Sequence, residues 1–484
     1  MSTVSTPGQS ADVFGDLVQI VGAENATREQ CDLVCYEKDF SVSSPSSRFL
    51  PDFVVQPETT EHVSAVVRLA NRQRIPLVPR GGGTGMWGGA VPTHGGIVLD
   101  MRKMDRILDV DEEKRLVTVQ AGVLVRGLAA YLEKRGFFVA DKPESWFSAT
   151  IGARTQANGI GYLYNLRYGT SVGQVICLEV VLPTGEVIRT GPPKIYDPAS
   201  GYDLTRLFSC TEGTLGVVTE VTLRIYKLPE HRVFRIVEFP SYQDMISAAV
   251  VIRDSGLVPE TIETMDGISY RLYFQGANAG KVSAQQVPRT MGAMVIGCAG
   301  VKKIAETQMD FTQDICARFG GKPAPDGCVE TWTAFRETYP INPFPLYTAL
   351  MKKPIKYVLD ATVHLESTPD VVRAYHALLD KYGVESHGIV SVHCAPDFHA
   401  AVYAQAYVDE RNEKDIETIR QMQDEIHNYV TSIGGGIGGA GGIGLMRMEY
   451  GKGQCASALA FMKRLKQILD PNNIMNPGKK LGGD

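Results

Sequence analysis

A glycine-rich segment near the start of the chain has the composition of an anion-binding loop. It reads VPRGGGTGMWGGAVPTHGG, from Val78 to Gly96, and it begins at the end of an apolar run. Because glycine has no Cβ, consecutive peptide N–H groups can turn toward one anion from backbone conformations that other residues avoid. Arg80 could add a positive charge and Thr84 a hydroxyl group. The segment therefore predicts a diphosphate site, with a flexible surface loop as the alternative.

The sequence around these glycines does not fit the two common nucleotide-binding loops. A GxGxxG fingerprint needs a helix directly after the glycines, whereas Ile97 to Met101 is predicted to be a strand. A helix N-terminus is therefore not expected at the anion. No Gly-Lys-Ser or Gly-Lys-Thr closes the segment, so it is not a P-loop either. We expect main-chain amides around Arg80 to bind the anion.

The wider sequence resembles the vanillyl-alcohol oxidase and p-cresol methylhydroxylase superfamily, whose FAD-binding domain is called PCMH-type. Five blocks carry the resemblance in the family's order: Phe49 to Gly85, Pro143 to Ala153, Asn158 to Val187, Phe208 to Ile225 and Ile468 to Leu481. The branch it resembles most contains the glycolate oxidase flavoprotein subunit and D-lactate dehydrogenase. The resemblance implies an α+β fold, in which a PCMH-type FAD-binding domain of two subdomains is joined to an antiparallel-sheet cap (substrate) domain covered by helices.

The resemblance also implies FAD as the cofactor and a set of residues that contact it. These residues are Pro79, Arg80, Gly81, Gly82, Gly83, Thr84, Gly85, Met86, Gly89, Pro143, Ser145, Thr150, Ile151, Gly152, Asn158, Gly159, Tyr168, Gly169, Glu212, Gly213, Gly216, Val217, Val218, Asn476 and Lys479. Covalent attachment through the glycine loop is not expected, because members that link FAD there place a histidine where this chain has residues 82–85. Non-covalent binding is therefore expected.

The pattern along the chain divides it into four stretches. We expect a helical lead-in at residues 1–47, the FAD-binding domain at 48–228, the cap domain at 229–440 and a C-terminal return to the FAD-binding domain at 441–484. Within the second stretch, residues 116–125 are predicted to form a strand and residues 125–136 a helix that ends at glycine. Residues 217–223 alternate as a half-buried strand would.

The catalytic groups carry a weaker signal, because flavin chemistry needs little from the protein beyond orienting the substrate and moving one proton. The branch named above has a metal site built from histidines and a glutamate. In this chain, Ala440 and Gly441 stand where that branch has the acid and one histidine, while His393 and His399 remain from the other motif. Two histidines make a poor metal site, so no metal is predicted.

Four residues are candidates for catalysis: His393, His399, Arg447 and Glu449. The two histidines lie in the predicted cap sheet, although a packed or solvated histidine is the alternative. Arg447 and Glu449 could meet a substrate carboxylate or hydroxyl, with a surface ion pair as the alternative. The glycine tract from Gly434 to Gly444 is expected to leave space where relatives have bulky ligands.

These features predict an FAD-linked dehydrogenase or oxidase that takes a hydride from the CH–OH group of a small organic substrate, with 2-hydroxy acids favoured. Oxidation of para-substituted phenols and a non-redox flavoenzyme resembling alkylglycerone-phosphate synthase remain alternatives. A subunit that holds FAD without turnover is a further one. The electrons could pass to oxygen, to a quinone or to a separate electron-acceptor protein, and a homo-oligomer is compatible with the sequence.

Composition narrows the partners and the compartment. The net charge of −5 gives no electrostatic reason to expect nucleic acid. No apolar stretch reaches the length of a transmembrane helix, and the N-terminus does not have the pattern of a signal peptide. The cysteines are scattered and form no repeated Cys-x-x-Cys, which favours a reducing compartment and no internal iron–sulfur cluster. We therefore expect a cytoplasmic protein.

Overall fold

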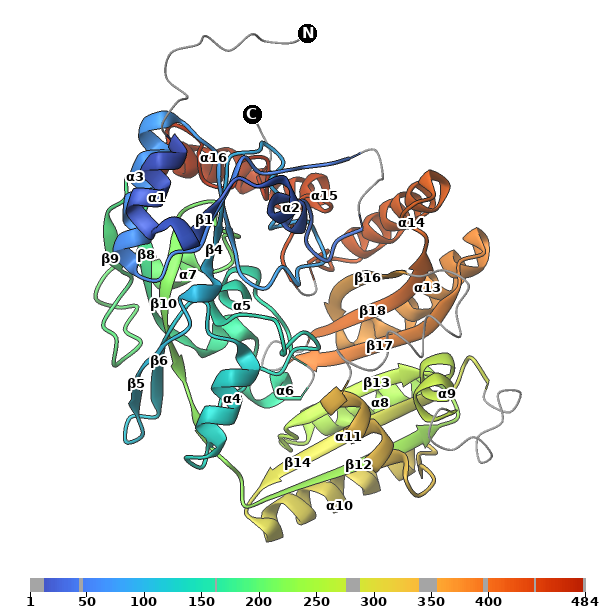
Figure 1. The fold of residues 1–484 in the computed structure, drawn as a ribbon. Coiled ribbons are helices and arrows are strands. Elements are labelled where there is room, and N and C mark those ends of the chain that lie inside the picture. Colours follow the sequence, from blue (N-terminus) through green and yellow to red (C-terminus); the bar gives the residue numbers. More distant parts are fainter. Residues whose placement is uncertain are drawn as a thin grey trace.

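The chain folds into two halves that meet along one side of a large antiparallel sheet (Figure 1). The computed structural model describes residues 13–42, 47–161, 163–275, 288–338, 355–394, 399–438 and 441–481. The half formed by the first part of the chain carries two of the main sheets, and the other half carries the third and largest.

The first sheet positions the glycine segment. Its strands are β1 (Ala26–Thr27), β2 (Phe53–Val55), β4 (Ile97–Asp100) and β3 (Leu77–Arg80), in this spatial order, with β2, β4 and β3 parallel. Three helices accompany it: α1 (Val13–Val21), α2 (Gln30–Leu33) and α3 (Thr60–Gln73). Strand β3 ends at Arg80, directly before the first glycines, and the strand predicted to follow the segment is β4. The glycine segment therefore connects two neighbouring parallel strands.

The second sheet forms the other subdomain of this half. Its strands are β5 (Ile107–Asp111), β6 (Leu116–Gln120), β10 (Val217–Arg224), β8 (Val175–Val181) and β9 (Val187–Arg189), all antiparallel in this order. Three helices accompany it, namely α4 (Val125–Glu133), α5 (Ile151–Ala157) and α7 (Leu204–Phe208), while α6 (Asn165–Tyr168) contacts the cap sheet. A small pair of strands, β7 (Phe137–Phe138) and β11 (Tyr226–Lys227), lies beside it. Strand β6 and helix α4 are the predicted strand and helix.

Strand β10 is buried more completely than its sequence predicts. The alternation of residues 217–223 indicates one buried and one exposed face, yet only Glu220 and Arg224 are not fully buried. The reason is tertiary: β10 lies in the centre of the sheet between β6 and β8, and α3 and α5 both contact it. On the second face, the hydroxyl of Thr222 is accommodated by a hydrogen bond with the hydroxyl of Thr118 on β6.

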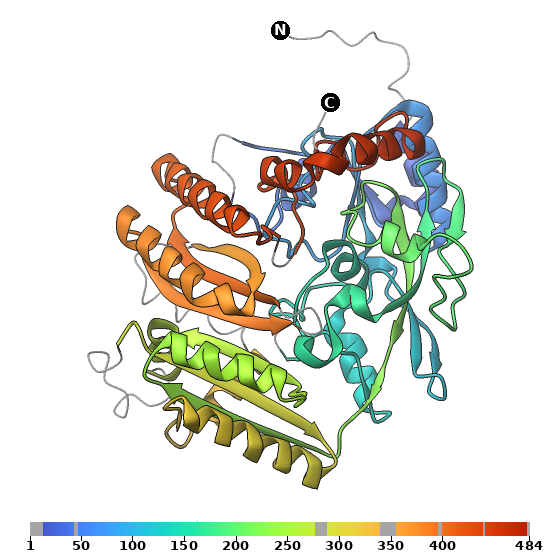
Figure 2. The ribbon, with the colours of Figure 1, turned by 180° about the vertical axis from the view of Figure 1, so that it is seen from behind.

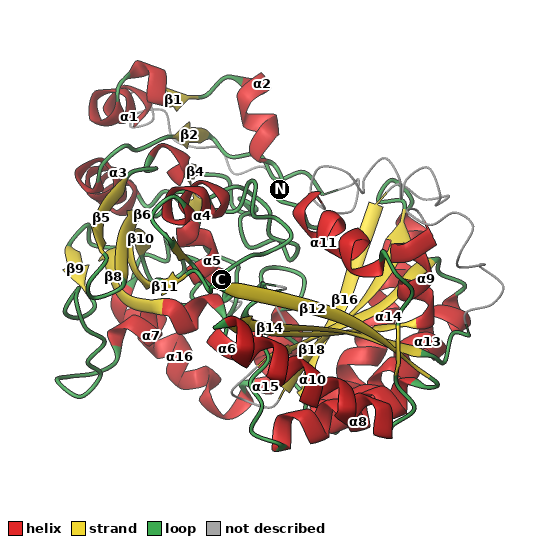
Figure 3. Cartoon of the chain, turned by 90° about the horizontal axis from the view of Figure 1, so that it is seen from below, coloured by secondary structure: helices red, strands yellow, loops and turns green. Residues whose placement is uncertain are grey.

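The cap sheet confirms the predicted antiparallel architecture. Within the described residues its order is β15 (Lys322–Pro323), β12 (His231–Phe239), β14 (Gly292–Gly300), β13 (Thr261–Asp266), β17 (Ser386–Cys394), β18 (His399–Val408) and β16 (Ile355–His364). Four helices cover one face (Figure 2), namely α8 (Tyr242–Asp254), α10 (Lys302–Arg318), α13 (Thr368–Tyr382) and α14 (Glu413–Ser432). Helices α9 (Gly267–Gln275) and α11 (Cys328–Thr338) lie on the other side of the sheet (Figure 3).

The end of the chain returns to the first sheet. After α15 (Met448–Gln454) and α16 (Ala456–Leu469), the amide of Leu77 donates to the carbonyl of Ile474, and the amide of Asn476 donates to the carbonyl of Leu77. The C-terminal segment therefore runs beside β3, next to the glycine segment. The domain boundaries at residues 47, 228 and 440 stay predictions. None of the helices in the described ranges is long and apolar enough to cross a membrane.

Candidate active site

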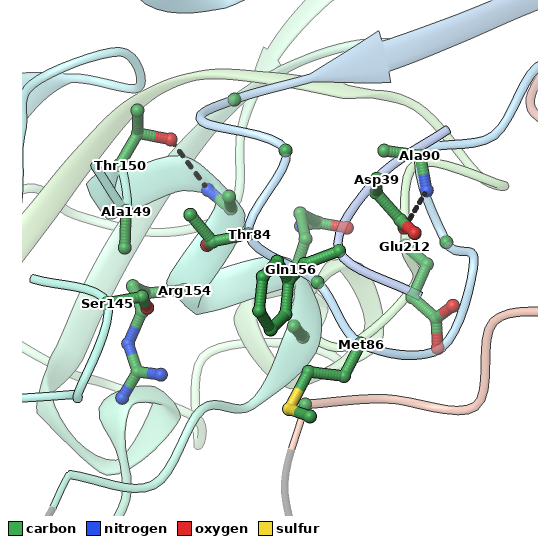
Figure 4. Close-up of a pocket in the computed structure, with 18 of the residues that line it drawn as sticks. Asp39, Thr84, Met86, Ala90, Ser145, Ala149, Thr150, Arg154, Gln156 and Glu212 are labelled. Carbon is green, nitrogen blue, oxygen red and sulfur yellow. Dashed lines mark hydrogen bonds between the residues drawn. The ribbon is translucent and has the colours of Figure 1, made fainter. Parts of the chain in front are cut away.

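A cavity of about 490 Å³ lies between the glycine segment and the cap sheet. This volume falls within the range of roughly 300–1,000 Å³ that is usual for small-molecule sites. Its walls come from the glycine segment, from residues 143–160, from the turn before β10 and from the cap strands β16 and β18. Figure 4 shows Ser145, Ala149 and Thr150 on one side of the pocket and Asp39, Ala90 and Glu212 on the other.

Most of the residues predicted to contact FAD line this cavity. They are Pro79, Arg80, Gly81, Gly83, Thr84, Gly85, Met86, Gly89, Pro143, Ser145, Thr150, Gly152, Glu212, Gly213, Gly216, Val217 and Val218. The remaining ones do not line it: Gly82, Ile151, Asn158, Gly159, Tyr168, Gly169, Asn476 and Lys479. Three separate segments of the predicted FAD site, 79–89, 143–152 and 212–218, therefore meet at one cavity, although their contact with FAD stays a prediction.

The glycine loop fits a diphosphate through its main chain. A Cβ at Gly82 would overlap the carbonyl oxygen of Ser148, and one at Gly81 would overlap the Thr150 hydroxyl, so the loop can lie against residues 148–150 only as glycine. Among the described residues, no hydrogen-bond acceptor is found for the N–H groups of residues 82–85. Main-chain donors without partners at a cavity wall are what an anion requires.

The Arg80 side chain lines the cavity and also bonds to the main chain on either side of it. Its guanidinium donates to the carbonyl of Lys38 at 2.9 Å and to that of Ala90 at 3.4 Å. Nearby, the buried Asp39 carboxylate accepts hydrogen bonds from the amides of Ser41 and Ala90. Burial raises the pKa of Asp39, while these amides and Arg80 act in the opposite direction. Arg80 and Asp39 therefore fasten the lead-in to the loop, and no sequence motif indicated Asp39.

The expected open space in the C-terminal glycine tract is not found at Gly442 and Gly444. The Glu212 carboxylate accepts the amides of Ile443 and Gly444 at 2.7 and 2.8 Å. A Cβ at Gly442 would overlap that carboxylate, and one at Gly444 would overlap the carbonyl of Trp87. These glycines permit close packing on the wall of the cavity, so the prediction of vacated volume was wrong at both positions.

Two residues of the C-terminal segment hold it against the glycine segment. The side-chain amide of Asn476 donates to the carbonyls of Gly89 and Glu212. The Lys479 ammonium is buried and donates to the carbonyl of Val91, and burial lowers the pKa of this lysine to about 8. Neither side chain lines the cavity. Asn476 bonds to Gly89 and Glu212, which line the cavity, and Lys479 bonds to Val91, two residues after Gly89.

We expect Glu212→Gln to loosen the glycine tract. The glutamine side chain keeps one acceptor but turns an NH₂ group toward a main-chain N–H, which leaves a buried donor unpaired at a cost of about 1–3 kcal/mol. Amide hydrogen exchange at Ile443 and Gly444 should accelerate in the variant. Glu220→Gln is the control, because the Glu220 carboxylate pairs with the Arg189 side chain and not with the glycine tract. This variant should leave exchange at both amides unchanged. Equal protection in Glu212→Gln and the wild type would contradict the assignment.

The cap contributes a polar wall that the sequence did not indicate. In β18, the alternate residues Ala400, Val402, Ala404 and Ala406 lie in the core under the helices, whereas Tyr403, Gln405 and Tyr407 line the cavity. Asp360 of β16, opposite Tyr403 in the ladder, also lines it.

Arg447 supports this wall from outside the cavity. Its fully buried guanidinium forms an ion pair with Asp360 and lies 3.1 Å from the centre of the Trp87 ring. Trp87 and Asp360 both line the cavity, while Arg447 does not. Among the catalytic candidates whose side chains the structure describes, Arg447 is therefore the one connected to the site, through Asp360 and Trp87.

The other catalytic candidates lie elsewhere or cannot be placed. His393 is opposite Ala400 in the ladder of β17 and β18, and its side chain is outside the described residues. His399 begins β18 opposite His364 and does not line the cavity. Glu449 is 73% exposed and pairs with Lys452. Within the described ranges, which omit 395–398 and 439–440, no cluster of three or more His, Cys, Asp or Glu side chains could hold a metal.

Comparisons with known proteins agree with this geometry. A family model described as an FAD-binding domain matches residues 51–191, and one described as the C-terminal domain of FAD-linked oxidases matches residues 228–480. The chain is 32% identical to the glycolate oxidase subunit GlcD of Bacillus subtilis, with 98% of this chain and 97% of the relative covered. It is 30% identical to a mitochondrial D-lactate dehydrogenase (cytochrome) of Arabidopsis thaliana, with 92% and 76% covered.

Solved structures show the same fold at lower identity. A 4-ethylphenol oxidase from Gulosibacter chungangensis superposes with a TM-score of 0.82 at 17% identity, covering 99% of this chain and 98% of the other. An alkyldihydroxyacetonephosphate synthase gives 0.77 at 20% identity, covering 98% and 86%. The predicted fold class, the predicted family resemblance and FAD as the cofactor are thereby confirmed.

Proposed function

Because the chain belongs to the family of FAD-linked oxidases, we propose that it oxidises the CH–OH group of a small organic molecule held between the FAD-binding loops and the cap sheet. One observation carries the proposal: a single cavity has the glycine loop at one wall and the polar side chains of β16 and β18 at another. When bound, FAD supplies the hydride acceptor. The protein must then hold the cofactor, orient the substrate and exclude water.

The proposed binding of FAD uses the segments that surround the cavity. The amides of residues 82–85 bind the diphosphate, and residues 143–152 and 212–218 flank the rest of the cofactor. Attachment is non-covalent in this proposal, since residues 82–85 include no histidine, the residue through which members of the superfamily link FAD at this loop. Asn476 and Lys479 act indirectly by holding the C-terminal segment in place.

A 2-hydroxy acid is the substrate class that we favour. Two relatives that cover most of the chain are named for glycolate and D-lactate. Arg80 and Arg154 line the cavity, but four carboxylates line it too and Arg154 is paired with Asp141, so the choice of a 2-hydroxy acid rests on these relatives. The second candidate is a para-substituted phenol, favoured by the side chains of Tyr403 and Tyr407 in the cap wall.

Anaerobic reduction of the bound flavin tests the proposal without knowledge of the electron acceptor. The FAD-loaded protein is mixed with D-lactate, glycolate or 4-ethylphenol, with and without a chelator, and the flavin absorbance is followed. We expect a 2-hydroxy acid to bleach the flavin, and we expect the chelator to leave this bleaching unchanged. Bleaching by 4-ethylphenol alone would replace the first candidate with the second. A flavin that no CH–OH donor or phenol reduces would overturn the proposed function, and loss of bleaching with the chelator would contradict metal-independent oxidation.

A further inference from the structure

Gln405 occupies the centre of the cap wall. It lies on β18 between Tyr403 and Tyr407, which line the cavity with it, because every second residue of a strand points to the same face. The neighbouring Ala404 and Ala406 point to the opposite face and are buried under the helices. A glutamine is therefore placed at a position where an apolar side chain would satisfy the packing of the sheet.

The side chain of Gln405 is buried without a complete set of hydrogen bonds. Gln405 is 2% exposed, and its Oε1 atom has no hydrogen-bond partner among the residues that the structure describes. A buried polar atom without a partner destabilises a protein, and nearly all such atoms in native proteins are paired. At the wall of a ligand cavity, the missing partner is expected to arrive with the ligand.

The other carboxylate and carboxamide groups of the cavity are already engaged. Asp39 accepts two main-chain amides, and Glu212 accepts two more from the glycine tract. Gln156 accepts the Thr211 hydroxyl and the Gly213 amide. Asp360 is paired with Arg447, and Glu144 lies 3.8 Å from the guanidinium of Arg336. Gln405 thus presents an acceptor that the fold itself does not use.

We propose that Gln405 is the substrate-orienting residue of the cap wall and accepts a hydrogen bond from the hydroxyl group of the substrate. This proposal rests on the proposed function and adds one requirement to it. The substrate must have a hydrogen-bond donor that reaches the Oε1 atom of Gln405. A carboxamide is too weak a base to take the proton, so Gln405 fixes the hydroxyl and another group accepts the proton.

Gln405→Met tests the proposal, since methionine has nearly the same volume and no comparable acceptor. In the FAD-loaded protein without substrate, we expect the melting temperature to rise or stay constant, because an unpaired buried oxygen has been removed. With whichever of D-lactate, glycolate and 4-ethylphenol reduces the wild type, we expect KM to rise about tenfold or more, as loss of one buried hydrogen bond predicts. The rate of flavin reduction at saturating substrate should fall less than KM rises.

Gln120→Met is the matched control. Gln120 is equally buried, but its Oε1 accepts the amide of Arg106 and its Nε2 donates to the carbonyl of Glu58. This variant should lower the melting temperature and leave KM unchanged. A melting temperature that falls in Gln405→Met as it does in Gln120→Met would overturn the proposal, as would an unchanged KM. If no probe reduces the wild type, the proposed function fails, while the melting temperatures still decide whether Gln405 is kept for a ligand.

Discussion

Gly82→Ala is expected to lose most FAD binding while the rest of the fold persists. The added methyl group would overlap the main-chain carbonyl of Ser148, which cannot rotate away as a flexible side chain could. The loop must then move off residues 148–150, and its amides at 82–85 no longer face the cavity as a set. Overpacking of this kind costs about 1–3 kcal/mol, which corresponds to a roughly 5- to 150-fold loss of affinity.

Titration of the apoprotein with FAD, followed by flavin fluorescence, measures this loss. Gly191→Ala is the control, because a Cβ at Gly191 would meet nothing within 4 Å and its φ is not positive. That variant should bind FAD as the wild type does. The melting temperature of each apoprotein shows whether the change is confined to the loop. Wild-type affinity in Gly82→Ala would show that the cofactor is not held by this loop.

Arg447→Met is expected to cause the largest loss of stability in the cap half. Arg447 and Asp360 are both buried, with side chains 0% and 1% exposed, so removing the guanidinium takes the positive charge away from a buried carboxylate in the wall of the cavity. Breaking a buried ion pair in this way costs about 3–5 kcal/mol. Loss of the contact with the Trp87 ring adds to the effect. Urea unfolding followed by tryptophan fluorescence measures the change.

A second variant separates the buried charge from the packing. Combining Arg447→Met with Asp360→Asn also removes the buried negative charge, and we expect the double variant to recover much of the lost stability. Arg420→Met is the control for a general effect of arginine, because its pair with Glu417 is exposed and such pairs contribute about 1 kcal/mol or less. If Arg447→Met lowered the free energy of unfolding no more than Arg420→Met does, the buried ion pair between Arg447 and Asp360 would not stabilise the protein as predicted.

The sequence predicted the cofactor-binding half well because its signals are local. Glycines mark positions where the backbone itself approaches a neighbour, and this can be inferred from residue type and order, as at Gly81, Gly82 and Gly213. The strands on either side of the loop followed from short apolar runs. Asp39 was missed because its role depends on the position of Ala90, some fifty residues later, which no local pattern indicates.

The cap wall could not be predicted in the same way. Alternation along β18 shows that Tyr403, Gln405 and Tyr407 share one face, but not that this face meets the glycine loop. That placement depends on how the cap sheet packs against the first half, which is a tertiary property. The same holds for Arg447, which is a candidate because it follows the glycine tract closely in the sequence, and which is connected to the site through its contacts with Asp360 and Trp87.

Amide hydrogen exchange of residues 82–85 with and without FAD tests the central claim most directly, because it reports on the main-chain donors themselves. We predict that these amides exchange rapidly in the apoprotein and become strongly protected when FAD is added, while the amides of α10, far from the cavity, do not change. Exchange at residues 82–85 that FAD leaves unaltered, in a protein that nevertheless retains the cofactor, would contradict the account.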